Sequence, residues 1–342
     1  MTFHPFHSLP YAFGGPAMTG CLKQQTDDFI VDELLPFQPE GSGEHCFLQI
    51  EKCHENTEYI ARLLARHAGV RQRDIGYAGL KDRHGRTRQW FSVWLPGKAD
   101  PDWQALESER LQILAVSRHP RKLKRGVLLG NRFGLRIRQL QGDRARLEQQ
   151  LQAIAAQGFP NYFGEQRFGH QGRNLQQALA MFAGSKVKRE QRSIYWSAAR
   201  AYVFNCILAE RVRGQCWSRG LSGEVLQLAD SHSFFTAPHI DQALDNRLQT
   251  FDLHPTGALW GLGLNPASGE ALAIEQAVIL AYPELAQGLE AAGLEQDRRA
   301  LRVRPLELRW QWLADDELSL AFQLPAGSYA TVLAREIVAV EA

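Results

Sequence analysis

The most informative stretch of this chain is Gly76-Tyr77-Ala78-Gly79-Leu80-Lys81-Asp82-Arg83-His84-Gly85-Arg86-Thr87-Arg88-Gln89-Trp90-Phe91-Ser92-Val93. Its first half is a glycine-punctuated turn with a single carboxylate, Asp82, and its second half begins an alternating, aromatic strand over residues 89–95. Four cations surround that carboxylate: Lys81, Arg83, Arg86 and Arg88. A carboxylate among cations stays ionised at neutral pH, and the same cations are suited to hold an RNA phosphate. The stretch therefore predicts chemistry carried out on a nucleic acid.

Length and composition indicate an ordinary globular protein. The 342 residues exceed the roughly 250–300 at which one hydrophobic core stops growing, so two domains are expected. Hydrophobic residues make up 44% and charged residues 22%, which suffices for packed cores. No apolar run is long enough to cross a bilayer, and the first residues do not resemble a signal peptide. We expect a cytoplasmic protein with no membrane partner.

The sequence offers no convincing metal site. Five cysteines are few and odd in number for a disulfide framework in a chain of this length. The pairs His45-Cys46 and Cys53-His54 do not have the usual spacing of zinc ligands. We interpret these cysteines as buried thiols on a strand and in the turn after it.

Motifs for the common cofactors are also missing. The sequence lacks a G-x-x-x-x-G-K-[ST] phosphate loop, an H-E-x-x-H zinc helix and a G-x-S-x-G nucleophile elbow. Gly261-Leu262-Gly263 begins like a dinucleotide fingerprint, but Pro266 stands where a helix should begin, so we interpret the segment as a loop. An isomerisation, hydrolysis or group shift carried out by side chains alone, with no cofactor, is therefore favoured.

Charge is segregated along the chain. Residues 1–200 hold 29 Lys and Arg against 19 Asp and Glu, whereas residues 201–342 hold 10 against 18. The peak is the segment 118–138, which contains eight Lys or Arg and no acidic residue. Such a block is typical of either a solvated loop or a polyanion contact. Because Asn131 and Phe133 follow in a glycine-rich, aromatic stretch, contact with RNA is the favoured interpretation.

Hydrophobic periodicity predicts a mixture of strands and helices. Alternating runs predict strands at 29–34, 46–52, 89–95, 111–117, 133–138, 306–313 and 318–324. Amphipathic runs predict helices at 57–68, 143–157, 175–182 and 194–212, the first with Asn56 as a possible N-cap. The last two strands form a hairpin that has few partners unless it returns to the early strands. A strand-rich domain interrupted by a more helical insertion, at about 156–304, is therefore predicted.

Four segments, in order along the chain, resemble the TruD family of tRNA pseudouridine synthases. The quoted stretch from Tyr77 to Gln89 resembles the family signature. The further segments are Leu129-Gly130-Asn131-Arg132-Phe133, Pro160-Asn161-Tyr162-Phe163-Gly164-Glu165-Gln166-Arg167-Phe168-Gly169 and Pro325-Ala326-Gly327-Ser328-Tyr329-Ala330-Thr331. Together they span most of the chain, which makes a chance resemblance improbable.

This resemblance implies an α+β fold. It implies a catalytic pseudouridine-synthase domain with a mixed, mostly antiparallel sheet, at residues 1–155 and 305–342. An inserted TruD-specific α/β domain is expected at residues 156–304. The implied substrate is a uridine of tRNA, at position 13 in bacterial members, and we expect a monomer that needs no protein partner.

The resemblance also implies the site residues. Asp82 falls on the catalytic aspartate of the family, and Phe29, Asn131 and Tyr329 fall on positions that contact the target nucleotide. Lys23 and Phe133 resemble the basic and aromatic residues that flank the aspartate. Because Phe is often found in place of Tyr329, a stacking role is expected there rather than a role for its hydroxyl.

The implied chemistry suits a lone carboxylate. Pseudouridine formation breaks the bond from ribose to a base nitrogen and rejoins the uracil through carbon, so it requires neither cofactor nor metal. Asp82 either attacks the sugar carbon as a nucleophile or removes a sugar proton to give a glycal, and it assists loss of the proton on the base carbon. Phe133 would pack against the uracil and retain it, although Phe cannot act as an acid or base. The nucleotide must leave its stack first, and stacking on Phe29 or Tyr329 would offset that cost.

Each assignment has a structural alternative. Asp82 is alternatively a turn carboxylate, and Lys23 a surface lysine. Phe29 and Phe133 are alternatively core residues, and Asn131 a turn residue between two glycines. Similarly, three residues of the 161–169 segment are expected to form a buried polar network joining the domains, with RNA contact secondary: Asn161, Glu165 and Arg167.

Two other functions compete with the isomerase. An RNA-binding protein without catalysis would keep the basic and aromatic residues but would not need Asp82. A metal-dependent nuclease would need clustered carboxylates, whereas Asp82 has no acidic neighbour in its stretch.

Overall fold

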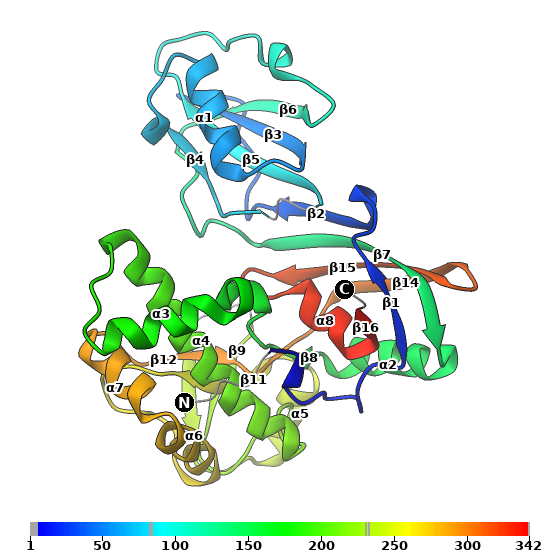
Figure 1. Ribbon diagram of the computed structural model, residues 1–342, viewed down its shortest axis with the longest axis vertical. Helices are drawn as coiled ribbons and strands as arrows, with labels where there is room; N and C mark the ends of the chain where they lie inside the picture. The colour runs from blue at the N-terminus through cyan, green and yellow to red at the C-terminus, as the bar shows by residue number, and fades with distance from the viewer. Residues whose placement is uncertain (1–5, 82–84, 230, 232, 341–342) are drawn as a thin grey trace. The chain divides into compact units, whose positions relative to one another are not determined.

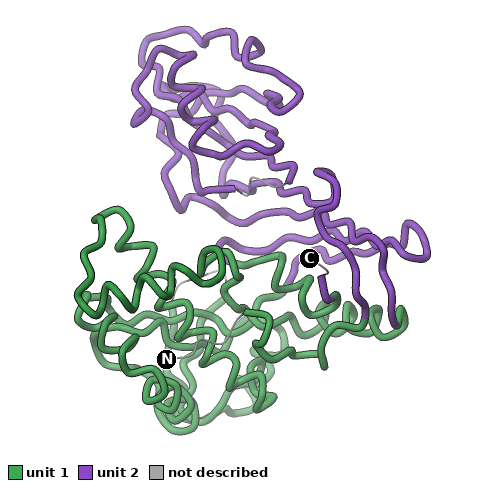
Figure 2. Tube along the Cα trace, viewed as in Figure 1, with its two compact units in different colours: residues 1–17, 143–304, 328–338 green, residues 18–142, 305–327, 339–342 purple. Residues whose placement is uncertain are grey.

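A computed structural model describes residues 6–81, 85–229, 231 and 233–340 of the chain. The chain forms two compact units (Figure 2). The sheet unit comprises residues 18–142, 305–327 and 339–342, and the helical unit comprises residues 1–17, 143–304 and 328–338. The boundaries of these units differ from those of the predicted catalytic domain (1–155 and 305–342) and the predicted insertion (156–304). That functional division stays a prediction.

One twisted sheet dominates the sheet unit (Figure 1). Its strands are β1 (Met18–Leu22), β2 (Phe29–Leu34), β3 (His45–Cys53), β4 (Ile75–Tyr77), β5 (Arg86–Trp94), β6 (Leu111–His119), β7 (Gly130–Gly142), β14 (Leu306–Ala314) and β15 (Glu317–Pro325). The main order is β14–β15–β7–β2–β5–β3–β6, with β1 also on β7 and β4 on β5. Of these pairs only β2–β5 is parallel among the residues described. The predicted α+β class with a mostly antiparallel sheet is confirmed.

The C-terminal hairpin returns to the early strands, as predicted. β14 and β15 pair with each other, and β15 then pairs with β7 from Leu318↔Ile137 to Pro325↔Gly130. This register explains why Gly130 is a glycine, because a Cβ there would overlap the carbonyl of Leu324. The pairing fills the edge of β7 and gives the hairpin the partner that an isolated hairpin lacks.

Helix α1 (Thr57–His67) covers the core at β3, β4 and β5. Its spacing buries Ile60 and Leu64 completely, against fully buried Leu48 and Phe91 of the sheet. Each such side chain contributes about 1.5–3 kcal/mol relative to an exposed one. Asn56 occupies the N-cap position, as predicted, although its side chain makes no capping hydrogen bond.

Helices surround a small sheet in the helical unit. The helices are α2 (Arg144–Gln157), α3 (Arg173–Phe182), α4 (Arg189–Arg213), α5 (Gln242–Gln249), α6 (Gly269–Ala281), α7 (Pro283–Ala291) and α8 (Ala330–Ile337). The strands are β9 (Glu224–Leu228), β10 (Phe234–Ala237), β11 (Leu253–Leu259) and β12 (Asp297–Ala300), in the order β10–β9–β11–β12, with the separate pair β8 (Phe159–Pro160) and β13 (Arg302–Val303). The last strand, β16 (Val338–Val340), also belongs to the large sheet, where it pairs with β1, and it straddles the boundary between the units.

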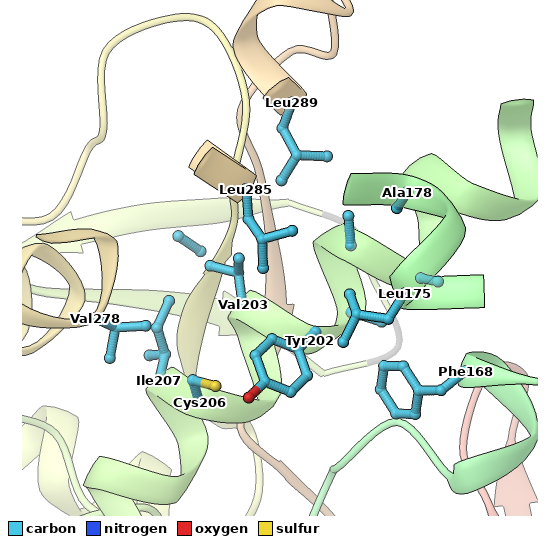
Figure 3. Packing of buried hydrophobic residues seen from close by; sticks show 14 residues of the cluster. Phe168, Leu175, Ala178, Tyr202, Val203, Cys206, Ile207, Val278, Leu285 and Leu289 are labelled. Carbon is cyan, nitrogen blue, oxygen red and sulfur yellow. The ribbon is translucent and has the colours of Figure 1, made fainter. Parts of the chain in front are cut away.

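The core of the helical unit forms around α4 (Figure 3). Small residues such as Ala198 and Ala201 are buried on this helix and allow α3 and β11 to approach it. Tyr202 and Ile207 of α4 then pack with Leu285 of α7. In the part of the chain that the structure describes, no helix has the length and apolarity needed to cross a membrane.

The end of the chain carries a buried charge cluster in the helical unit. Glu336 of α8 is fully buried and accepts a hydrogen bond of 2.9 Å from the backbone N–H of Ala12. Arg335 is also buried, and its guanidinium lies 3.7 Å from the ring centroid of Tyr11. Burial raises the pKa of Glu336 to about 7, although Arg335 and backbone hydrogen bonds from Ala12 and Phe13 oppose the shift.

Glu336 should make stability fall as the pH rises from about 4.5 to 7. The folded state binds the Glu336 proton more tightly than the unfolded state, so its contribution is fully present below the unfolded pKa of 4.5 and is lost as pH rises through about 7. By linkage the loss is on the order of 3 kcal/mol. Urea unfolding of the wild type and Glu336→Gln across this pH range measures it, and the slope should be smaller in the variant.

A matched control is Glu284→Gln, which changes an exposed glutamate of α7. Its profile should follow the wild type. Equal slopes for the wild type and Glu336→Gln would contradict the assignment of the buried proton to Glu336.

Candidate functional site

Strands β2 and β7 bring three of the predicted site residues together in the sheet unit. In their antiparallel register, Phe29 pairs with Leu135, Val31 with Phe133, and Glu33 with Asn131. The rings of Phe29 and Phe133 meet edge to face, with centroids 6.3 Å apart. Both side chains are buried, at 5% and 7% exposed, so core packing accounts for much of their surface.

Asn131 lies within a strand and not in a turn. It stands on β7 between β2 and β15, opposite Glu33 and Leu324, so the alternative of a turn residue between two glycines is wrong. Its side-chain oxygen is buried and finds no hydrogen-bond partner among the described residues. A buried amide oxygen without a partner is costly, so the position is suited to accept a hydrogen bond from a ligand.

Lys23 lies directly over Phe29. Its ammonium is 4.1 Å from the centroid of the Phe29 ring, a cation–π distance. The residue has a left-handed backbone, with φ 61°, between β1 and the short 3-10 helix Thr26–Asp28. Lys23 also lines a hollow of about 400 Å³, together with Gln24, Gln25, Thr26, His54 and Gly85. The hollow therefore adjoins the signature stretch at Gly85.

Asp82 lies outside the described residues, with Arg83 and His84. The structure describes the chain on both sides of this gap. On the first side, the ammonium of Lys81 forms an ion pair of 2.6 Å with Glu33, and these side chains are 6% and 0% exposed. Glu33 also accepts a hydrogen bond of 3.1 Å from the backbone N–H of Trp90. Burial raises the pKa of Glu33, and Lys81 and the Trp90 N–H oppose the shift.

A chain of hydrogen bonds holds the same side of the gap. The backbone N–H of Lys81 donates to the hydroxyl of Thr57 at 3.1 Å, and that hydroxyl donates to Gln89 at 2.9 Å. The Gln89 amide in turn donates to the carbonyl of Gly79 at 2.6 Å. Helix α1 and strand β5 therefore fix the backbone at two positions shortly before Asp82.

The second side of the gap is held by carboxylates. A Cβ on Gly85 would lie 2.7 Å from the carbonyl oxygen of Phe29, so only glycine allows this close approach. Arg86 forms ion pairs of 2.6 Å with Asp27 and 2.5 Å with Glu51. The chain before and after residues 82–84 is thus tied to fixed strands.

Most of the signature cations already have partners, which revises their predicted role. Lys81 pairs with Glu33 and Arg86 with Asp27 and Glu51, while Arg88 pairs with Glu51 at 2.8 Å and Asp32 at 3.4 Å. Burial acts to raise the pKa of Glu51, but hydrogen bonds from Arg88 and Arg86 outweigh it and lower the pKa. These cations are engaged in holding the fold, so the prediction that they hold a phosphate is not favoured.

Sequence reasoning missed the carboxylates that hold the signature cations. Four of them lie near the signature in space but not in sequence: Asp27, Asp32, Glu33 and Glu51. A signal was available, because Glu33 and Glu51 stand among apolar residues in runs that were predicted as strands. A charged residue at such a position needs a buried partner.

Tyr329 belongs to the helical unit, at the N-cap position of α8. Its hydroxyl accepts hydrogen bonds from Nε and Nη2 of Arg167, at 3.2 and 3.0 Å. Arg167 also donates to the hydroxyl of Ser197 at 3.2 Å. A Cβ on Gly164 would lie 2.8 Å from the Tyr329 ring, so glycine at that position makes room for the ring. The hydroxyl is thus occupied by a structural contact.

The 161–169 segment does take part in a polar network, within the helical unit. The side-chain oxygen of Asn161 accepts from Arg299 at 2.7 Å and from Ser328 at 3.3 Å. Arg167 binds Tyr329, as above. Glu165 is exposed and has no contact of this kind among the residues described, so its predicted membership is wrong. Asn161 and Arg167 connect the segment to residues 328 and 329.

The cysteines are free in this structure. Cys46 is fully buried on β3, and burial raises the pKa of its thiol to about 12. Within residues 6–81, 85–229, 231 and 233–340, no group of three or more His, Cys, Asp or Glu side chains is placed to hold a metal ion.

Comparison with known proteins gives a consistent result. The family model for tRNA pseudouridine synthase D (TruD) matches residues 7–181 and 173–337. A protein named tRNA pseudouridine synthase D from Methylococcus capsulatus is 49% identical over 344 residues, covering 99% of this chain and 97% of the relative. A protein of the same name from Nitrosococcus oceani is 50% identical over 333 residues, covering 96% and 93%.

A solved structure shares the fold. It is a crystal structure from Methanosarcina mazei assigned to tRNA pseudouridine synthase D (TruD). The TM-score is 0.73 at 21% sequence identity, covering 96% of this chain and 95% of the other.

The buried pair of Lys81 and Glu33 should behave as a unit in stability measurements. Lys81→Met leaves Glu33 buried without its cation and should lower the free energy of unfolding by about 3 kcal/mol. The double variant Lys81→Met with Glu33→Gln removes both charges and should lose less than the single variant. Denaturant unfolding followed by tryptophan fluorescence measures both values.

The exposed pair of Arg213 and Glu210 on α4 is the control, because its side chains are 50% and 48% exposed. Arg213→Met should change stability by less than about 1 kcal/mol. An equally small loss for Lys81→Met would refute the role of the buried pair.

Proposed function

Because the chain belongs to the TruD family of tRNA pseudouridine synthases, we propose that it converts a uridine of tRNA to pseudouridine. We further propose that the target is position 13, that Asp82 is the only catalytic carboxylate, and that no cofactor is needed. The observation that carries the proposal is the match of nearly the whole chain to relatives named for this activity. We propose a monomer acting on cytoplasmic tRNA without a required protein partner.

The reaction is balanced by the substrate itself. The bond between C1′ of the ribose and N1 of uracil breaks, the base turns, and C1′ forms a bond to C5. The proton on C5 is lost and N1 gains a proton, so the product is an isomer of the substrate. Asp82 acts on the sugar, as a nucleophile at C1′ or as the base that yields a glycal. It then assists removal of the C5 proton.

The anchored signature supports this role for position 82. Gly79 and Lys81 are held before it, and Gly85 and Arg86 after it, by contacts to α1, β2, β3 and β5. Catalysis by a single side chain requires that its backbone be held to within a fraction of an ångström. The described residues before and after position 82 are held by the same unit, which supports this constraint.

The remaining residues would hold the nucleotide. In the proposal, Asn131 uses its unpartnered side-chain oxygen to bind the edge of the base. Phe29 and Phe133 form the apolar wall that retains the detached uracil, and Lys23 places a positive charge at that wall. Tyr329 stacks on the nucleotide through its ring, because its hydroxyl is held by Arg167.

Asp82→Asn should abolish pseudouridine formation while leaving tRNA binding intact, because the amide cannot act as nucleophile or base. The measurement compares wild type and variant on unmodified tRNA transcripts, with EDTA and without added cofactor, and detects pseudouridine by chemical labelling and primer extension. A transcript with cytidine at position 13 is the substrate control. Equal activity in both proteins would refute the assignment, and binding without activity in the wild type would favour the non-catalytic RNA-binding protein. Cleavage of the RNA that EDTA prevents would favour the nuclease.

Tyr329→Phe and Tyr329→Ala should differ if stacking is the role of this residue. The phenylalanine keeps the ring, so kcat/KM should stay within about threefold of the wild type. The alanine loses about 1–3 kcal/mol of stacking, which lowers kcat/KM by about 5- to 150-fold. Single-turnover assays on folded protein measure this. Equal losses in the two variants would show that the hydroxyl, and not the ring, is required.

A further inference from the structure

The segment between β6 and β7, residues 120–129, is fixed alongside the signature. The backbone N–H of Gly126 donates to the carbonyl of Ala78 at 2.8 Å. The backbone N–H of Leu123 donates to the hydroxyl of Ser92 at 3.0 Å, and its side chain is only 1% exposed. Gly76 packs so closely on Leu123 that a Cβ would overlap the Leu123 carbonyl. The segment therefore has a defined position beside the residues that lead to Asp82.

Four exposed cations belong to this region: Arg73, Arg121, Lys124 and Arg125. We call them the cationic strip. Arg73 is included because the ammonium of Lys122, in the 120–129 segment, donates a hydrogen bond to the Arg73 carbonyl and holds it beside that segment. Arg125 donates to the hydroxyl of Tyr77 at 3.0 Å, with its guanidinium 5.3 Å from the centroid of that ring. No described carboxylate forms an ion pair with any of the four.

The cationic strip contrasts with the signature beside it. Lys81, Arg86 and Arg88 are each neutralised by a carboxylate of the same unit. The strip has no such compensation, although its backbone is held in place. Fixed like charges in one segment repel each other, and a nucleic acid that binds them gains free energy by releasing the cations condensed on its phosphates. A nucleic acid backbone is a polyanion that suits several separate, exposed cations.

We propose that the cationic strip binds phosphates of the tRNA backbone next to the nucleotide that is modified. The signature cations, in this proposal, hold the loop and make no phosphate contact. The proposal rests on the proposed function for the identity of the RNA. It assigns RNA affinity to Arg73, Arg121, Lys124 and Arg125. It assigns to Lys81, Arg86 and Arg88 the anchoring of the described residues on either side of position 82.

The salt dependence of tRNA binding separates these assignments. Fluorescence anisotropy with an unmodified tRNA transcript gives Kd between about 50 and 300 mM NaCl. Each phosphate contact that is lost should reduce the slope of log K against log salt by about 0.7–0.9. Arg121→Ala and Lys124→Ala should each reduce the slope by this amount and weaken binding several-fold. The double variant should reduce the slope by about twice this amount.

Three control variants make the test specific. Lys98→Ala and Arg309→Ala remove exposed cations of the same unit that form no ion pair with a described carboxylate, and they should keep the wild-type slope. Arg88→Gln removes a signature cation and should also keep the slope. Circular dichroism and thermal unfolding verify that each variant is folded.

The outcomes are distinct from those of the catalytic test. Wild-type slopes for Arg121→Ala and Lys124→Ala would overturn the proposal, as would an equal reduction in Lys98→Ala and Arg309→Ala. A reduced slope for Arg88→Gln would overturn the division between strip and signature. Binding is measured without catalysis, so a protein that binds through the strip but forms no pseudouridine would refute the proposed function and leave the cationic strip standing.

Discussion

The ion pair between Lys81 and Glu33 is the interaction on which the candidate site depends. Two charges taken out of water cost several kcal/mol each, and only short contacts and further hydrogen bonds repay that cost. Here the ion pair is 2.6 Å long and Glu33 also binds the backbone N–H of Trp90. The pair therefore joins three separate parts of the chain: β2, β5 and the turn that leads to Asp82. Apolar contacts alone would not specify the register of that turn so closely.

Periodicity predicted the elements that have one buried and one polar face. Helices α1, α2, α3 and α4 were found at the expected places, as were seven strands of the sheet unit: β2, β3, β5, β6, β7, β14 and β15. Strand β1 was not predicted. Helix α8 was missed. Seven of its eight residues are buried, including Arg335 and Glu336, although charged residues normally mark an exposed face. β4 was missed because a strand of three residues, Ile75–Tyr77, is too short for an alternating pattern.

The site was predicted only in part, because a sequence shows residue types and their order but not which residues meet in space. Residue type and order along the chain sufficed to find the signature and the aromatic residues of β2 and β7. The partners of the signature cations were not predicted, because Glu33 lies 48 positions from Lys81 and only the parallel pairing of β2 with β5 brings the two segments together. Charge is visible in a sequence, whereas its neutralisation depends on the fold.

Positively charged residues have two roles in this unit that look alike in the sequence, and pairing with a carboxylate distinguishes them. A cation held by a buried carboxylate loses its freedom to follow a ligand but fixes the backbone that carries it. The same reasoning applies to Tyr329, whose hydroxyl is held by two donors of Arg167. A group already bound by the fold is a poor candidate for chemistry, which is why we proposed a stacking role for Tyr329 and no role for its hydroxyl.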